Sequence, residues 1–301
     1  MLPHQPVPIV GQAAALVALE QQASQLIHWS LGAQAHTALS LLASSLPQYF
    51  HLYDPTKTYS PVLTVFWQAC LHKEVLYQPY LSIADVSALI GHLKDDTVSK
   101  YISRKRYDQR YETRQLHQHL TDYATAMFTR YARVLVVRVD LGYRGGSQSS
   151  VTIDQVYQHI NALVSLKTQK QGIFAHLVGY AWRLEQGVDK GYHIHWTSFY
   201  AGHQHQNDWY MGDTLGQLWL QITCGLGQFY NCNTREIKQH YERLGRLGIG
   251  MIYRNDNDQV QQALQAIGYL ADPRKIDAPD KPPQHLRMRP HQSKTFATGQ
   301  C

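Results

Sequence analysis

The spacing of apolar residues divides the chain into a helical first part and a mixed second part. Residues 12 to about 125 are typical of helices: residues 13–26 are rich in Ala, Leu and Gln, and residues 85–93 follow Ser82, which can cap a helix. From Arg133 the pattern changes, because residues 134–140 are rich in β-branched side chains, as a strand requires. The tail from Ala271 is rich in Pro, Lys and Arg and has no period.

The pattern in the second part predicts, in order, a strand, a helix, a hairpin, two helices, a strand and a helix. The predicted elements are, in order, a strand (134–140), a Gly/Ser loop (142–150), a helix from Thr152 with Gln155 completing a capping box, a hairpin of two strands (173–185 and 192–200), a helix capped by Asp213, a helix capped by Asn233 with Glu236, a strand (248–253) and a helix (256–270). Crossover helices are too few for a doubly wound parallel sheet. We therefore predict an α+β fold with an antiparallel central sheet and flanking helices, preceded by a helical region. The predicted domains are a helical accessory region (1–125), the α+β domain (126–270) and a basic C-terminal tail (271–301).

Composition and charge favour a folded protein with a polyanionic partner. Hydrophobic residues make up 44% of the chain and charged residues 17%, which supports a sizeable core and argues against overall disorder. The net charge of +6 suits a nucleic acid, although many proteins with such an excess never bind one. The four cysteines form no CxxC pair, which argues against a disulfide framework and a thiolate zinc site. No signal peptide and no apolar run of about 18 residues is found, so we expect a cytoplasmic protein with no membrane partner.

A basic stretch with interleaved tyrosines closes the helical region. One interpretation is a solvated helix face with its tyrosines turned to the core. The other is a surface that contacts phosphates and stacks on bases. The candidate DNA-binding residues there are Arg104, Lys105, Arg106 and Arg110.

The predicted hairpin carries the clearest chemistry. His193 and His195 lie two residues apart on a strand and therefore project to the same face. A turn centred on Asp189 pairs Glu185 with His193, and directly opposed residues have Cβ atoms about 4.5–5.5 Å apart. Two histidines alone could be hydrogen-bonded residues of a half-exposed sheet face, but that interpretation gives no reason for the opposed glutamate. The three residues therefore predict a site for a divalent metal, Mg or Mn, with Zn also compatible.

These residues also carry a family resemblance. His193-Ile194-His195 resembles the His-hydrophobic-His motif of the HUH endonuclease superfamily, and Glu185 resembles the acidic third ligand of its replication initiators. Residues 136–143, the hairpin, residues 248–252 and residues 268–270 are similar, in that order, to the inovirus-type replication initiators, also called the YagK/YfjJ C-terminal domain family. The resemblance covers roughly residues 105–301. It implies an HUH fold of ferredoxin or RRM type and a metal-dependent nickase that initiates rolling-circle replication of a filamentous phage, prophage or related element.

The resemblance also implies a tyrosine nucleophile downstream of the histidines. Tyr269 falls at the family position and lies opposite the apolar stripe of its helix, whereas the alternative nucleophile, Tyr241, shares a stripe with Ile237 and Leu244. The family commonly has a lysine three residues after the tyrosine. Asp272 occupies that position here, so Lys275 or Arg274 would have to assist catalysis, with Arg274 also a candidate DNA contact.

The implied reaction nicks and rejoins single-stranded or hairpin origin DNA through a 5′-phosphotyrosine, with a host replication helicase and polymerase as further partners. Three alternatives remain open. The protein could be an HUH-type transposase, a non-catalytic DNA-binding regulator with a structural metal, or a metalloenzyme unrelated to DNA, although the last has no use for the Arg/Lys clusters.

Overall fold

The computed structural model describes residues 11–29, 35–272 and 284–300. They form two compact units. The first takes its described residues from 1–109, 149–153 and 286–293, and the second from 110–148, 154–285 and 294–301. The mixture of helices and antiparallel strands, with helices predominating at the N-terminal end, confirms the predicted α+β class. None of the helices in these ranges combines the length and the apolar composition that crossing a lipid bilayer requires.

The first unit is a small helical assembly with a two-stranded sheet. Ser82 caps α4 as predicted, since its hydroxyl accepts from the Asp85 N–H and the Asp85 carboxylate accepts from the Ser82 N–H. The sheet was not predicted, and its second strand comes from the expected tail. The elements are α1 (Gln12–Ile27), α2 (Ala35–Ser45), η1 (Leu46–Leu52), β1 (Lys57–Tyr59), α3 (Pro61–His72), α4 (Ile83–Leu93), the first part of α5 (Asp96–Arg130) and β7 (Met288–Pro290).

The second unit is built on an antiparallel sheet of six strands among the described residues. The order is β5-β2-β4-β3-β8. Strands β6 and β5 lie on the same edge of β2: β6 pairs with its first half and β5 with its second half. The strands are β2 (Arg133–Tyr143), β3 (Leu177–Gly187), β4 (Gly191–Ala201), β5 (Gly227–Asn231), β6 (Gly250–Tyr253) and β8 (Phe296–Gln300).

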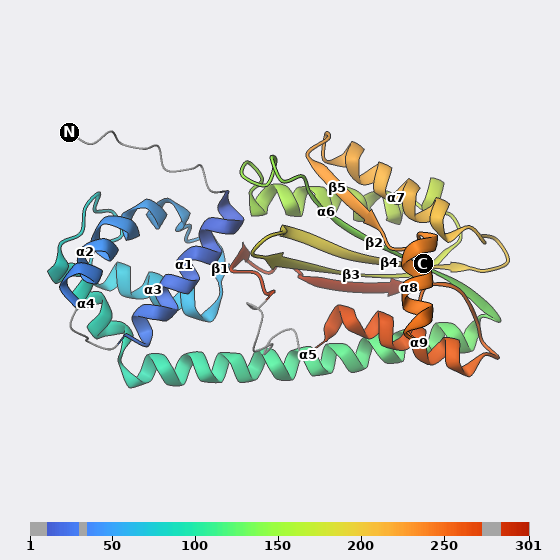
Figure 1. Cartoon of the computed structure of the whole chain (residues 1–301), viewed down its shortest axis with the longest axis horizontal. Coiled ribbons are helices and arrows are strands. Elements are labelled where there is room, and N and C mark those ends of the chain that lie inside the picture. Colours follow the sequence, from blue (N-terminus) through green and yellow to red (C-terminus); the bar gives the residue numbers. More distant parts are fainter. Residues whose placement is uncertain (1–10, 30–34, 273–283, 301) are drawn as a thin grey trace. The chain divides into compact units, whose positions relative to one another are not determined.

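Helices cover both faces of this sheet (Figure 1). On one face lie α6 (Ile153–Thr168) and α7 (Asp208–Ile222), where Trp219 of α7 donates to the Gly142 carbonyl and packs against Tyr143. On the other lie the second part of α5 and α9 (Asn257–Gly268), whose apolar side chains share a core with Val134 and Val136 of β2. Because side chains alternate along a strand, Arg138 and Asp140 project to this second face, next to the core.

Three local predictions were wrong. Asp213 lies inside α7, which Asn207 caps by accepting from the Tyr210 N–H. Asn233 does not cap α8 (Arg235–Arg243); Thr234 does, because the Asn233 side chain bonds to the backbone of Arg138. The first hairpin strand begins at Leu177 rather than at residue 173, because Gly172–Phe174 form a 3-10 turn, η2. Strand β8, within the expected tail, pairs with β3 in the main sheet.

Candidate metal centre

The hairpin has the predicted register. Glu185 of β3 lies directly opposite His193 of β4, and Arg183 lies opposite His195. Residues 188–190 form the turn between Gly187 and Gly191, and Gly191 has a positive φ of 58°, which favours glycine at the point where β4 begins. Opposed residues share a face of the sheet, so the carboxylate and both imidazoles project to the face covered by α9.

The three side chains meet in a buried cluster. The Glu185 Oε2 atom lies 3.2 Å from Nε2 of His195 and 3.6 Å from Nε2 of His193. All three ligand atoms lie within 4.8 Å of one another, and Glu185 is only 1% exposed. Among the residues that the structure describes, this is the group that could hold a metal ion. Two nitrogens and a carboxylate oxygen at such separations suit a divalent cation with further positions open.

Each of the three candidate ligands also has a second contact, on the side of its polar group that faces away from the cluster. The Nδ1–H of His195 donates to Oδ1 of Asp140 over 2.6 Å, and the Nδ1–H of His193 donates to the Gly191 carbonyl over 3.2 Å. A carbonyl can only accept, so the proton of a neutral His193 ring sits on Nδ1 and the lone pair of Nε2 faces Glu185. Arg183 Nε holds the other carboxylate oxygen, Oε1, at 3.4 Å. Such outer contacts are typical of protein metal sites, and the residues present fit a metal ion.

Asp140 is a site residue that the sequence analysis did not single out. Burial opposes ionisation of its carboxyl, but the hydrogen bond from His195 and the charges of His195 and Arg138 outweigh burial and hold its pKa well below the ordinary value. The β2–β4 register places Asp140 opposite His195. Only this long-range pairing reveals the contact, because nothing in the local sequence around Asp140 points to His195.

Tyr269 lies beside the cluster. Helix α9 ends at Gly268, and the single 3-10 turn η3 (Tyr269–Ala271) follows, with Leu270 and Ala271 buried. The Tyr269 ring centroid is 6.3 Å from that of His195, and the Arg138 guanidinium lies 5.3 Å from the Tyr269 centroid while also pairing with Asp140 at 3.4 Å. Burial and the Glu185 charge raise the pKa of Tyr269, and the Arg138 charge opposes this. The side chain remains 43% exposed, as expected for a residue opposite the apolar stripe.

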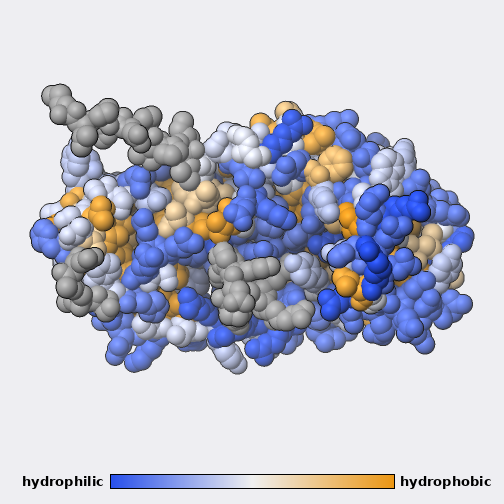
Figure 2. Space-filling model, in the orientation of Figure 1, coloured by the Kyte–Doolittle hydropathy of each residue, from blue (hydrophilic) through white to orange (hydrophobic). Residues whose placement is uncertain are grey.

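A pocket of about 930 Å³ is lined by both histidines of the cluster and by Arg138, Asp140 and Tyr269. Tyr241, the alternative nucleophile, also lines it. The packing role predicted for Tyr241 is wrong, because α8 buries no side chain and Tyr241 is 44% exposed. Figure 2 shows the strongly hydrophilic surface of α8. The lining combines cations and aromatic side chains, including Arg138, Lys190, Arg246, Tyr230, Tyr241 and Tyr269.

The predicted basic residues lie elsewhere. Arg104, Lys105 and Arg106 are exposed on the part of α5 that belongs to the first unit, and Arg110 begins the second unit. Neither Arg104–106 nor Arg110 lines the pocket. Arg274 and Lys275 lie outside the described residues.

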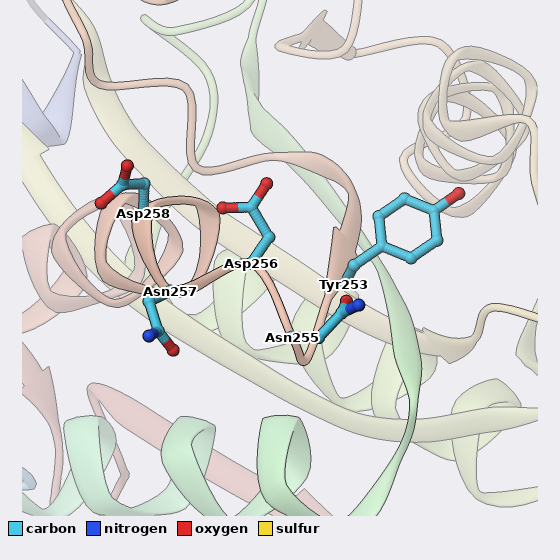
Figure 3. Close-up of a pocket in the computed structure, with 5 residues that line it drawn as sticks. All are labelled: Tyr253, Asn255, Asp256, Asn257 and Asp258. Carbon is cyan, nitrogen blue, oxygen red and sulfur yellow. The ribbon is translucent and has the colours of Figure 1, made fainter.

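A further pocket, of about 650 Å³, lies at the turn between β6 and α9 (Figure 3). Its lining includes Tyr253, which is 44% exposed. Asp256 caps α9 by accepting from the Gln259 N–H, so a structural role accounts for this carboxylate.

The sheet, the buried Glu-His-His cluster and the adjacent tyrosine define an α+β protein with a centre able to bind a metal. The model of the YagK/YfjJ C-terminal domain family matches residues 97–281, more than half of the chain, and the chain belongs to this family. The matched region contains the three candidate ligands, Asp140 and both candidate tyrosines. Comparison with curated proteins and with solved structures gives no significant match.

Proposed function

We propose that this protein is a metal-dependent nickase of the HUH type that initiates rolling-circle replication. One observation carries the proposal: the two histidines of a buried Glu-His-His cluster and a half-exposed tyrosine line one pocket, together with cations and aromatic rings. Rings and cations of this kind suit single-stranded DNA, whose bases stack on aromatic side chains while its phosphates contact basic groups. Origin DNA, single-stranded or in a hairpin, is therefore the proposed substrate, and the cytoplasm the proposed compartment.

Glu185, His193 and His195 would hold the divalent metal, Mg or Mn with Zn compatible. When bound, the metal would withdraw electron density from the scissile phosphate and offset the negative charge of Glu185 near the phenol. Asp140, the Gly191 carbonyl and Arg183 keep the three ligands in their binding orientation. Arg138 holds the Tyr269 ring and brings a positive charge to the oxygens on which negative charge builds up.

Tyr269 is the proposed nucleophile. Its phenol oxygen forms a bond to phosphorus as the bond to the 3′ oxygen breaks, giving a 5′-phosphotyrosine. The phenol loses its proton and the departing 3′ oxygen gains one, so the products are the DNA–tyrosine ester and a 3′-hydroxyl. A host polymerase and helicase could extend from that hydroxyl. The ester retains the bond energy of the phosphodiester, so the reverse attack rejoins the strand.

A cleavage assay with a labelled single-stranded origin oligonucleotide and Mn or Mg tests this function. Wild-type protein should cleave, and both His193→Ala and Glu185→Gln should abolish metal-dependent cleavage while leaving the far-ultraviolet circular dichroism unchanged. Cleavage that survives chelation would contradict the metal mechanism. Tight, salt-sensitive binding with no covalent adduct would favour a DNA-binding regulator instead.

A further inference from the structure

Helix α4 and the first part of α5, both in the first unit, have the layout of a helix-turn-helix. Only Lys94 and Asp95 separate them, and the chain changes direction sharply at this point (Figure 1). Helix α4 packs against α2 and α3 and buries Leu89 and Leu93 completely. Two helices joined by a short turn, the first held in a small helical core, form the motif that presents a helix to the major groove of DNA.

The turn is fixed by its own hydrogen bonds. The Asp95 carboxylate accepts from the Thr97 N–H at 2.8 Å and from the Thr97 hydroxyl at 2.6 Å. The Asp95 carbonyl accepts from the Val98 N–H at 3.0 Å. These contacts cap α5 and set the direction in which it leaves the turn.

The first part of α5 presents a basic, polar face. Val98 and Ile102, one turn apart, are its buried residues between positions 97 and 107. Lys100 and Arg104, also one turn apart, lie on the opposite side of the helix. No acidic residue occurs between Thr97 and Tyr107. The exposed residues are Thr97, Ser99, Lys100, Tyr101, Ser103, Arg104, Lys105, Arg106 and Tyr107.

We propose that α5 is a recognition helix and that the first unit binds double-stranded DNA through the major groove. A single exposed helix, about 10–12 Å across, matches the width of that groove, about 12 Å. Lys100 and Arg104 can reach phosphates or guanine edges, and Ser99 and Ser103 offer hydroxyls to base edges. This function goes beyond nicking: the metal centre acts on a single strand, whereas this helix reads a duplex. It does not depend on the chemistry of Tyr269.

Duplex selection with the full chain tests the proposal. The protein is mixed with a library of duplexes with a randomised centre, in the presence of a chelator so that no metal-dependent cleavage takes place. The triple variant Lys100→Gln/Arg104→Gln/Arg106→Gln is compared with a control of equal charge change, Lys73→Gln/Arg130→Gln/Lys170→Gln, whose residues are exposed elsewhere. Fluorescence anisotropy then measures the affinity for the enriched duplex and for its separated strands at several salt concentrations.

Wild type and control should enrich a defined sequence and bind its duplex more tightly than either strand. The triple variant should lose the enrichment. The slope of its plot of log affinity against log salt should be smaller in magnitude by about 2–3 than that of the control, because each lost phosphate contact reduces the slope by about 0.9. If the triple variant and the control bind the duplex with equal affinity, the proposal is overturned. It is also overturned if the triple variant loses as much affinity for the separated strands as for the duplex. A failure of nicking affects neither result, since no cleavage is measured.

Discussion

Asp140 provides a sharp test of the metal centre, because it contacts a proposed ligand rather than the metal. Its carboxylate accepts the Nδ1–H of His195 over 2.6 Å and so keeps Nε2 turned toward Glu185. Loss of such an outer contact typically reduces metal affinity 10–100-fold, or about 1.4–2.7 kcal/mol. Asp140→Asn retains an acceptor oxygen but loses the charge, so we expect a loss near tenfold. Asp140→Ala removes the acceptor and should approach 100-fold.

Isothermal titration with Mn²⁺ measures these affinities directly, and the absorption spectrum of bound Co²⁺ reports the geometry around the ion. Asp258→Asn is the matched control, since it makes the same chemical change at an exposed residue away from the cluster and should bind like wild type. Unchanged Mn²⁺ affinity in both Asp140 variants would refute the idea that Asp140 orients His195. Loss of the folded circular dichroism spectrum in Asp140→Ala would leave Asp140→Asn as the deciding variant.

Three more predictions concern the nucleophile, the pH dependence and the fold. Tyr241→Phe should retain the covalent DNA adduct and Tyr269→Phe should lose it while still binding DNA, as a denaturing gel for the adduct and a native gel shift for binding would show; the reverse pattern would make Tyr241 the nucleophile. Because the pKa of Asp140 is lowered in the folded protein, its ionised form stabilises the fold above the unfolded-state pKa of 3.8, and this contribution is lost as the pH falls toward the folded-state value. Denaturant titrations at several pH values should therefore show that the free energy of unfolding falls less steeply below about pH 4 in Asp140→Asn than in wild type. Parallel plots of this free energy against pH for the two proteins would contradict the expectation. Gly216→Ala in α7 would bring a methyl group to 2.1 Å from the Phe229 ring, so we expect the free energy of unfolding to fall by about 1–3 kcal/mol. An unchanged free energy of unfolding would show that α7 can shift away from β5.

The sequence allowed prediction of those parts of the site that depend on local periodicity. Alternation along β4 and the short turn at Asp189 were enough to place Glu185 opposite His193. The pairing of β2 with β4 joins segments 55 residues apart, so the contact between Asp140 and His195 could not be predicted. The approach of Tyr269 to His195 likewise depends on the 3-10 turn that ends α9, and no helical period indicates such a turn.

Two departures from the prediction arise from tertiary contacts that local sequence does not reveal. Asn233 has the right type and spacing to cap α8, but its amide bonds to the Arg138 backbone and leaves the cap to Thr234. Strand β8 contains Gly299 and follows a tail rich in proline, so its local propensity is low. Its pairing with β3 forms through backbone hydrogen bonds at the open edge of a sheet, which local sequence does not reveal.

The central claim, that a tyrosine beside the metal centre joins covalently to DNA, is tested most directly by mapping the adduct. Wild-type protein would be incubated with an origin oligonucleotide and Mn²⁺, digested, and the peptide carrying the nucleotide identified by mass spectrometry. We expect a nucleotide joined through its 5′ phosphate to Tyr269, and no such adduct when a chelator is present from the start of the incubation. A nucleotide on a different residue, or metal-dependent cleavage with no peptide adduct at all, would contradict it.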